Sequence, residues 1–320
     1  MKFCAASVLA LGAASVASAE SWDMPMAYSA SNFHSEHGVI FADKVREATG
    51  GEIDITVHPG GSLFGGGDIK RAIQTGQVPI GERLMSAHAN ENAIFAYDNL
   101  PFIATTYDAN TALWDAAKPA FNEALAEQNL VALYSCPWPG QGFYFKTEVT
   151  SSADIQGLKF RSYNAATAQI AEELGMIPVQ VEAAELSQAL ATGVAEAFIS
   201  SGSTGYDRKV WEHLSHYYKV NAWLPRNYVM INKQTWDGLS ADMQAAVQGA
   251  ADEAGAACTA KSAELSDWYF EQLEANGMKV VDAGPEFLAE LQTIGAAMQA
   301  DWLENTGEAG QGILDAFAAK

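Results

Sequence analysis

Short apolar runs alternate with longer segments of helical periodicity in the first half of the chain. The short runs favour strands, whereas the longer segments end at glycines such as Gly50 and Gly76, as helices do. The expected strands are residues 22–28, 53–57, 78–81 and 130–135, and the expected helices are residues 36–49, 68–75 and 108–128. This order of strand and helix predicts the α/β class.

A weak internal similarity indicates two lobes. The expected strand at 53–57 leads to a helix that stops at Gly76, and the apolar segment 177–181 leads to a helix that stops at Gly193. Two related lobes would explain this similarity, and so would a β–α unit of the kind that many α/β proteins share.

One predicted helix is longer than the others. Residues 241–276 contain no proline, and they lie between a good N-terminal cap, Ser240, and a natural helix stop, Gly277. A helix of this length extends over roughly 54 Å, which exceeds the width of one lobe. We therefore expect the segment 240–276 to span both lobes. The alternative is two shorter helices that meet near Gly255.

The N-terminus has the features of a secretory signal peptide. Lys2 precedes an apolar run over residues 3–17, and the small residues at 17–19 suit a cleavage site. We expect residues 1–19 to be removed. No later segment has an uncharged apolar run long enough to cross a membrane. The sequence therefore predicts an exported protein that does not insert into the membrane.

Acidic residues outnumber basic ones by 39 to 18, and the formal net charge at pH 7 is −21. A surface of this sign disfavours nucleic acids and anionic membranes as partners. An anionic ligand would therefore need a local positive site.

Beyond the predicted signal peptide the chain has two cysteines, Cys136 and Cys258. A disulfide between them is compatible with an oxidising compartment, but their number alone does not establish it. Cys258 lies in the alanine-rich predicted helix, so we expect it to be a buried, small apolar residue.

An arginine at the end of a predicted strand is the main candidate for ligand binding. Residues 157–161 read Gly-Leu-Lys-Phe-Arg, and aromatic residues lie near them in the sequence. Arg161 would hold a carboxylate through two parallel hydrogen bonds. The alternative is a surface arginine paired with an acidic neighbour.

Several short motifs occur in an order that resembles the DctP-type solute-binding proteins of TRAP transporters. They are residues 41–53, 59–63, 75–78, 100–102, 157–161, 232–233 and 236–239, followed by the predicted long helix. The resemblance extends from about residue 22 to the C-terminus. It implies a periplasmic receptor with two α/β lobes, crossing strands and a long bridging helix. Such a receptor binds a small organic acid between its lobes and passes it to a membrane permease with a small and a large subunit.

The resemblance also implies a role for Arg161 as the residue that binds the ligand carboxylate. Lobe I would comprise residues 20–138 with about 227–266, and lobe II would comprise residues 139–226 with about 267–320. We expect a monomer without a cofactor.

The chain departs from the family pattern in two places. The family often has an amide-containing motif where residues 196–200 read Glu-Ala-Phe-Ile-Ser, so Ser200 or Ser201 is expected to replace the amide. Relatives that bind acidic sugars often have a second arginine near 139–143, and this chain has none there. One arginine among aromatic residues favours a monocarboxylate with an aromatic or short aliphatic body over a dicarboxylate.

Further residues are candidates for the walls of the cleft. The aromatic and apolar candidates are Tyr28, Met85, Phe102, Trp138, Phe143, Tyr163, Phe198 and Trp223, and core packing is the alternative for each of them. The polar candidates are Asn32, Glu82, Gln141, Ser200, Ser201 and Asn227. Arg226 is expected to form a surface or lobe-linking ion pair.

No metal site is expected. The histidine pairs His34–His37 and His213–His216 have a spacing that can bind zinc, but each lacks an evident third ligand. Two other functions stay open at this point: a secreted α/β enzyme in which Arg161 orients an organic acid, and a sensor module that passes a ligand signal to a membrane receptor.

Overall fold

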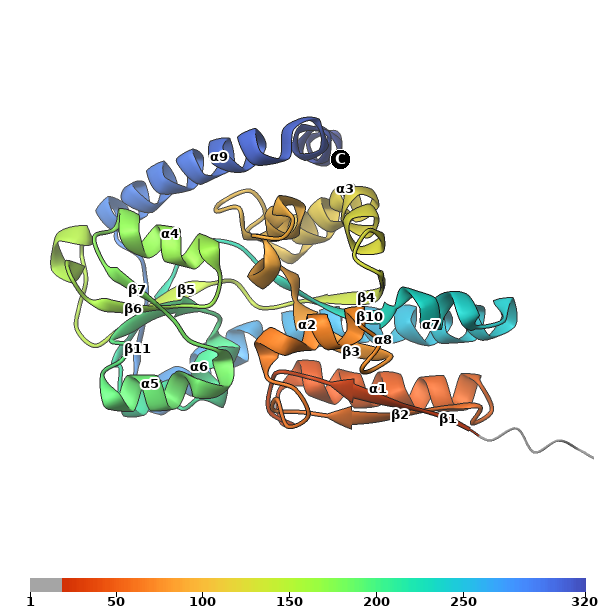
Figure 1. Ribbon diagram of the computed structural model, residues 1–320. Helices are drawn as coiled ribbons and strands as arrows, with labels where there is room; N and C mark the ends of the chain where they lie inside the picture. The colour runs from red at the N-terminus through yellow and green to blue at the C-terminus, as the bar shows by residue number, and fades with distance from the viewer. Residues whose placement is uncertain (1–18) are drawn as a thin grey trace, which may run out of the picture.

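The computed structural model describes residues 19–320, so the predicted signal peptide, apart from Ala19, lies outside the described residues. Figure 1 shows two lobes with long helices running past both. The strands are β1 (Glu20–Pro25), β2 (Ile53–His58), β3 (Ile80–Leu84), β4 (Leu130–Pro137), β5 (Gly142–Phe145), β6 (Lys159–Ser162), β7 (Ile177–Gln180), β8 (Ala197–Ser200), β9 (His216–Lys219), β10 (Arg226–Asn232) and β11 (Lys279–Asp282). The α-helices are α1 (Phe33–Ala48), α2 (Gly66–Gln74), α3 (Tyr107–Ala126), α4 (Ala165–Glu173), α5 (Leu186–Thr192), α6 (Gly202–Asp207), α7 (Lys233–Gly238), α8 (Ala241–Ala275) and α9 (Pro285–Ala318). The short 3-10 helices are η1 (Met85–His88), η2 (Ala93–Asn99), η3 (Ser152–Ile155), η4 (Ala183–Glu185) and η5 (Val210–Glu212).

Each lobe has its own β-structure. In the first lobe β1 and β2 pair in parallel, and β10 lies between β3 and β4, antiparallel to both. In the second lobe six strands form a mixed sheet in the order β11-β9-β5-β8-β6-β7. Strands alternate with helices along much of the chain, so the protein is in the α/β class, as the hydrophobic pattern predicts.

The central strand of the first lobe, β10, separates two parts of its core. Val229 and Ile231 pack with residues of α1 and α8 on one face of the sheet. Tyr228 and Met230 pack with residues of α3 on the other face. Successive side chains of a strand point to opposite faces, so this fully buried strand needs apolar residues at every position in its middle.

Two extended segments connect the lobes side by side, one leading from β4 to β5 and the other from β9 to β10. The backbone N–H of Trp138 donates to the carbonyl of Pro225 at 2.7 Å, and that of Gln141 donates to the carbonyl of Trp223 at 3.0 Å. The two crossing segments therefore form a hydrogen-bonded hinge of the kind that allows domain closure.

The predicted long helix is a single helix, α8, of 35 residues. The Ser240 side chain caps its first turn by accepting a hydrogen bond from the N–H of Met243 at 3.2 Å. Gly255 does not break the helix. A Cβ atom at this position would lie 2.9 Å from the Cβ of Tyr134, so glycine allows α8 to pack closely on β4. The helix contacts α1 and β4 of the first lobe and α6 and β11 of the second, and thus bridges both.

A second bridging helix, α9, is absent from the sequence prediction. Phe287 and Leu291 in its first half pack in the core of the second lobe, whereas Trp302 and Ile313 in its second half pack in the core of the first. It bends at Gly307, whose φ of 56° and ψ of −133° are accessible to glycine. The C-terminal segment that the sequence prediction assigns to lobe II therefore contacts both lobes. Within residues 19–320, no helix combines the length and apolar composition that crossing a membrane requires.

Cys136 of β4 and Cys258 of α8 form a disulfide, with their Cα atoms 5.8 Å apart. The expectation that Cys258 is only a small apolar residue is therefore wrong. The two cysteines are 122 positions apart, and the packing of α8 on β4 brings them together. The bond joins the long helix covalently to the sheet of the first lobe.

Candidate ligand-binding site

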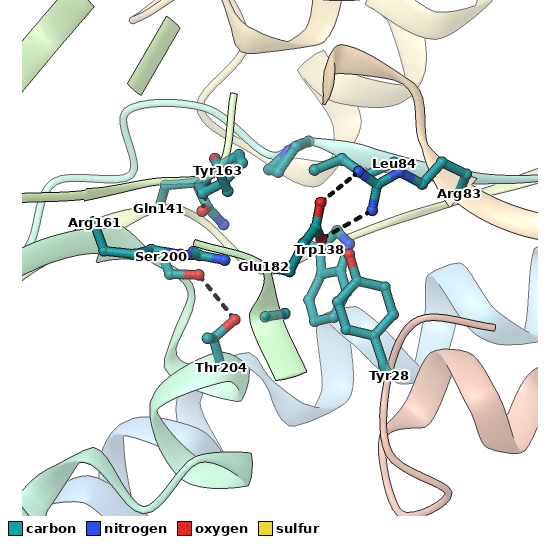
Figure 2. Close-up of a pocket in the computed structure, with 12 residues that line it drawn as sticks. Tyr28, Arg83, Leu84, Trp138, Gln141, Arg161, Tyr163, Glu182, Ser200 and Thr204 are labelled. Carbon is teal, nitrogen blue, oxygen red and sulfur yellow. Dashed lines mark hydrogen bonds and ion pairs between the residues drawn. The ribbon is translucent and has the colours of Figure 1, made fainter. Parts of the chain in front are cut away.

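A small cavity lies where the two lobes meet, beside the crossing segments. Its volume is about 40 Å³. Figure 2 shows the side chains of Arg161 and Ser200 entering it from the second lobe and those of Arg83 and Tyr28 entering it from the first. The lining residues are Tyr28, Arg83, Leu84, Trp138, Gln141, Arg161, Tyr163, Glu182, Ala183, Ser200, Thr204 and Pro225.

Arg161 is a buried cation on β6, with only 3% of its surface exposed. Its Nε donates to the carbonyl of Val181 at 2.8 Å, and its guanidinium carbon lies 5.2 Å from the centre of the Tyr163 ring. Within residues 19–320 it forms no ion pair. Burial lowers the pKa of Arg161 to about 10, so the group is still a cation at neutral pH. A surface arginine paired with an acidic neighbour is therefore excluded, and the site offers a desolvated positive charge to an anion.

A second arginine lines the cavity, which the sequence analysis does not foresee. Arg83 extends from β3 of the first lobe and Glu182 follows β7 of the second. The two guanidinium nitrogens donate to the two carboxylate oxygens at 3.0 and 3.2 Å. The family pattern places a second arginine near residues 139–143, and Arg83 lies outside that region. The available signal is two adjacent charged residues, Glu82 and Arg83, within a short segment that forms a fully buried strand.

Hydrogen-bonding groups and aromatic rings complete the walls. The Tyr163 hydroxyl donates to the side-chain oxygen of Gln141 at 3.2 Å. On the second lobe, the Ser200 hydroxyl donates to that of Thr204 at 2.8 Å. The Tyr28 ring packs edge-on against Trp138, with ring centres 4.7 Å apart. The structure therefore brings together six of the predicted residues, namely Tyr28, Trp138, Gln141, Arg161, Tyr163 and Ser200.

Two predicted wall residues lie in the core of the second lobe. Phe143 of β5 is fully buried and stacks on Phe145, with ring centres 5.8 Å apart. Phe198 of β8 is also fully buried and stacks on Tyr144 at 4.3 Å. Neither lines the cavity, because both sheet faces around these strands are covered by other side chains.

Three further predicted residues lie behind the lining. Trp223 donates its Nε1–H to the Tyr163 hydroxyl at 3.3 Å. The backbone N–H of Phe102 donates to the carbonyl of Ala222 on a crossing segment at 2.8 Å. Ser201 caps α6 and accepts a hydrogen bond from its backbone. These residues contact the lining or the hinge and do not reach the cavity.

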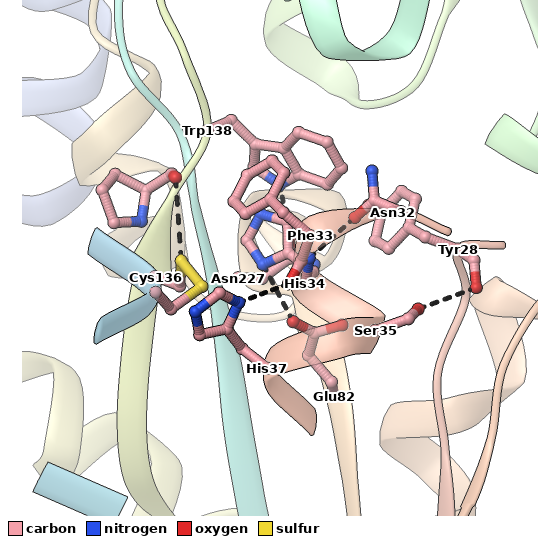
Figure 3. Close-up of polar contacts among 12 residues, drawn as sticks. Tyr28, Asn32, Phe33, His34, Ser35, His37, Glu82, Cys136, Trp138 and Asn227 are labelled. Carbon is pink, nitrogen blue, oxygen red and sulfur yellow. Dashed lines mark hydrogen bonds and ion pairs between the residues drawn. A yellow bond between two sulfur atoms is a disulfide. The ribbon is translucent and has the colours of Figure 1, made fainter. Parts of the chain in front are cut away.

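Glu82 and Asn227 belong to a buried polar cluster next to the disulfide (Figure 3). Asn227 accepts a hydrogen bond from Trp138 Nε1 at 2.8 Å, and Glu82 Oε1 lies 3.1 Å from His34 Nδ1. Burial lowers the pKa of His34 below its usual value. His34 also lies close to both cysteine sulfurs, but these form the disulfide and cannot act there as thiolate ligands.

Two candidates have other structural roles. Met85 packs in the core of the first lobe. Arg226 is buried, and it donates to Asn110 Oδ1 at 2.8 Å and to Ser135 Oγ at 2.9 Å. The expectation of a surface or lobe-linking ion pair for Arg226 is therefore wrong, because its side-chain partners are neutral residues of the first lobe.

Two asparagines that cap helices also connect the lobes. Asn32 at the start of α1 donates to Asp207 of α6 at 2.6 Å. Asn164 at the start of α4 donates to the side-chain oxygen of Asn99 in η2 at 2.5 Å and to Ser86 at 3.1 Å. With the Arg83–Glu182 ion pair, these contacts join the two lobes.

Two lobes, a hydrogen-bonded hinge and a buried cation in an interlobe cavity define the class of two-lobe solute-binding proteins. Within it, the chain belongs to the DctP family of bacterial extracellular solute-binding proteins, family 7, whose sequence profile matches residues 26–305. It is a periplasmic protein of the type that serves TRAP transporters, as the order of its motifs predicts. The family and the solved relatives are solute-binding receptors, not enzymes.

Solved structures share the whole fold. A TRAP solute-binding protein specific for pyroglutamate, from an unidentified microbe of a marine metagenome, was crystallised with co-purified pyroglutamate. It is 74% identical, with a TM-score of 0.94 over 94% of this chain and 99% of that one. DctP6 of Bordetella pertussis, an extracytoplasmic receptor that binds pyroglutamic acid, is 42% identical, with a TM-score of 0.92 over 94% of this chain and 100% of that one. These matches confirm the predicted two-lobe fold with a bridging helix.

A more distant relative is the C4-dicarboxylate-binding periplasmic protein DctP of Rhodobacter capsulatus. It is 26% identical over 223 residues, which cover 67% of this chain and 65% of that protein.

Proposed function

We propose that this protein captures pyroglutamate in the interlobe cavity, with Arg161 binding its carboxylate, and delivers it as a monomer to a TRAP-type membrane permease. The observation that carries the proposal is the buried guanidinium of Arg161, which forms no ion pair with any residue from 19 to 320. The pyroglutamate bound by a protein 74% identical supports the choice of ligand.

The chemistry of the cavity suits a cyclic amide with one carboxylate. The fork of Arg161 would take the carboxylate through two hydrogen bonds. The hydroxyls of Ser200 and Thr204 and the amide of Gln141 offer donors and acceptors to the lactam N–H and carbonyl. The rings of Tyr28 and Tyr163 would exclude water. Pyroglutamate is a monocarboxylate, as the sequence predicts. Its body is a lactam ring, however, and not the aromatic or short aliphatic body that the sequence predicts.

Enclosure between lobes follows from the size of such a ligand. The best small ligands gain at most about 1.5 kcal/mol per heavy atom, and micromolar binding requires about 8 kcal/mol. Most atoms of a small acid must therefore contact protein. Contacts that both lobes make only when closed would shift the population toward the closed state.

Calorimetric titration tests the ligand with three matched compounds. We expect pyroglutamate to bind with a Kd in the micromolar range or below. Cyclopentanecarboxylate, which lacks the amide, and 2-pyrrolidinone, which lacks the carboxylate, should each bind at least about a hundredfold more weakly, because each leaves buried polar groups unpaired. Binding of cyclopentanecarboxylate as tight as that of pyroglutamate would contradict the assignment.

Replacement of Asn164 by serine tests whether interlobe contacts set the affinity. Serine keeps the helix cap of α4 but reaches neither Asn99 nor Ser86, so the closed state loses two buried hydrogen bonds, each worth about 0.5–1.5 kcal/mol. We expect the Kd for pyroglutamate to rise about fivefold to a hundredfold, with little change in the melting temperature of the free protein. The control is Asn305→Ser on the exposed face of α9. Equal affinities of Asn164→Ser and the control would show that this contact does not contribute.

A further inference from the structure

The cavity contains three charged side chains, and their arrangement leaves one positive charge available. Arg161 has no ion-pair partner within the described chain, whereas Arg83 is held by Glu182 through two parallel hydrogen bonds. The cavity phenols are neutral, since burial raises the pKa of Tyr28 to about 12 and that of Tyr163 further. The net charge of the lining is thus matched to a ligand with a single negative charge.

We propose that Glu182 determines specificity: its carboxylate occupies Arg83 and thereby excludes ligands with a second carboxylate. The inference rests on the proposed function, in that the ligand is a small carboxylic acid bound at Arg161. It assigns to the Arg83–Glu182 ion pair a role in selecting monocarboxylates.

The geometry supports a fixed ion pair at this place. The Arg83 side chain is 5% exposed, and its Nε donates to His88 Nε2 at 3.4 Å. At the start of α2, a Cβ atom on Gly66 would lie 2.7 Å from Glu182 Oε2 and 2.8 Å from an Arg83 Nη atom. Glycine at this position therefore leaves the room that the ion pair fills. The surrounding structure thus holds Arg83, whereas the Glu182 side chain is 36% exposed and is fixed by its two hydrogen bonds to Arg83.

The charges in this cavity disfavour the binding of a dicarboxylate. One of its carboxylates would pair with Arg161. The other would face the negative charge of Glu182, or it would displace Glu182 from Arg83 and leave that carboxylate unpaired next to the ligand. Uncompensated or like charges in a desolvated site are a general means of rejecting a competing ligand.

Two ligands that differ only in the second charge test the inference. Glutarate has two carboxylates, and glutaramate has an amide in place of one of them. In the Glu182→Gln variant Arg83 is no longer neutralised. We expect the ratio of the glutarate Kd to the glutaramate Kd to fall by about tenfold to a hundredfold relative to wild type, as expected for new hydrogen bonds to a charged group. An unchanged ratio would overturn the inference.

Two further variants distinguish two possible effects of the ion pair: neutralising the charge of Arg83 and joining the two lobes. The Arg83→Gln/Glu182→Gln double variant again has one available cation, so its ratio should return toward that of wild type. A double variant with the same ratio as Glu182→Gln would overturn the inference, because the ion pair would then act only by joining the lobes. Glu185→Gln, which removes an exposed charge three residues away, is the matched control and should keep the wild-type ratio.

Failure of the proposed function gives a different result. A wild-type protein that does not bind pyroglutamate would contradict that ligand, whereas the inference is judged only by the change in the glutarate-to-glutaramate ratio between variants.

Discussion

Replacement of Arg161 by alanine is expected to abolish pyroglutamate binding, with the Kd rising by at least about a hundredfold. Two charge-assisted hydrogen bonds to the carboxylate are lost, each worth about 1.5–3 kcal/mol. The free protein should be as stable as wild type or more stable. The variant removes a buried cation that has no ion-pair partner within residues 19–320, and such a charge is destabilising.

Calorimetry and thermal denaturation measure the two effects of this change separately. At a pyroglutamate concentration of one hundred times the wild-type Kd, wild type should gain about 2.7 kcal/mol of stability and Arg161→Ala almost none. Arg161→Lys keeps the charge but not the planar fork, so it should recover only part of the affinity. Arg46→Ala, on the exposed surface of α1, is the control. Binding by Arg161→Ala within threefold of wild type would show that another group holds the carboxylate.

Removal of the disulfide is expected to lower the free energy of unfolding by about 4–5 kcal/mol. The bond between Cys136 and Cys258 closes a loop of 122 positions, and long loops lose the most entropy in the unfolded chain when they are cross-linked. Urea titration of the Cys136→Ala/Cys258→Ala variant would measure the loss. Wild type under reducing conditions is the second comparison, because it lacks the bond but keeps both sulfur atoms. A decrease below about 1 kcal/mol in both would contradict the prediction.

Local signals in the sequence, such as helix caps and the spacing of prolines, are sufficient to predict some individual elements, including the long helix. A proline-free run between Ser240 and Gly277 predicts α8, and the observed helix differs from this expectation by one residue at its end. The second bridging helix, α9, is not among the predicted elements, although Pro285 stands at its start and apolar residues such as Phe287, Leu291 and Trp302 follow a helical pattern. Its contacts with both lobes depend on tertiary packing and have no local signal.

The candidate site could be predicted only in part, for a physical reason. The sequence predicts Arg161 because a strand end and a family motif coincide there. Arg83 and Glu182 are 99 positions apart in different lobes, and only the closed arrangement brings them together. The prediction that Phe143 and Phe198 line the cleft rests on their aromatic character and their position near the motifs. Both faces of their sheet are covered, so composition cannot tell which face a strand residue occupies.

The crossing segment between β4 and β5 has a consequence for the choice of cargo. The backbones of Trp138 and Gln141 form the hinge bonds, and the same two residues line the cavity. An acid too large for the cavity would push on the hinge itself and hold the lobes apart. A membrane partner that recognises both lobes in their closed orientation would then reject the loaded receptor. The permease would thus select among ligands by the angle between the lobes, and the size of the bound ligand would determine that angle.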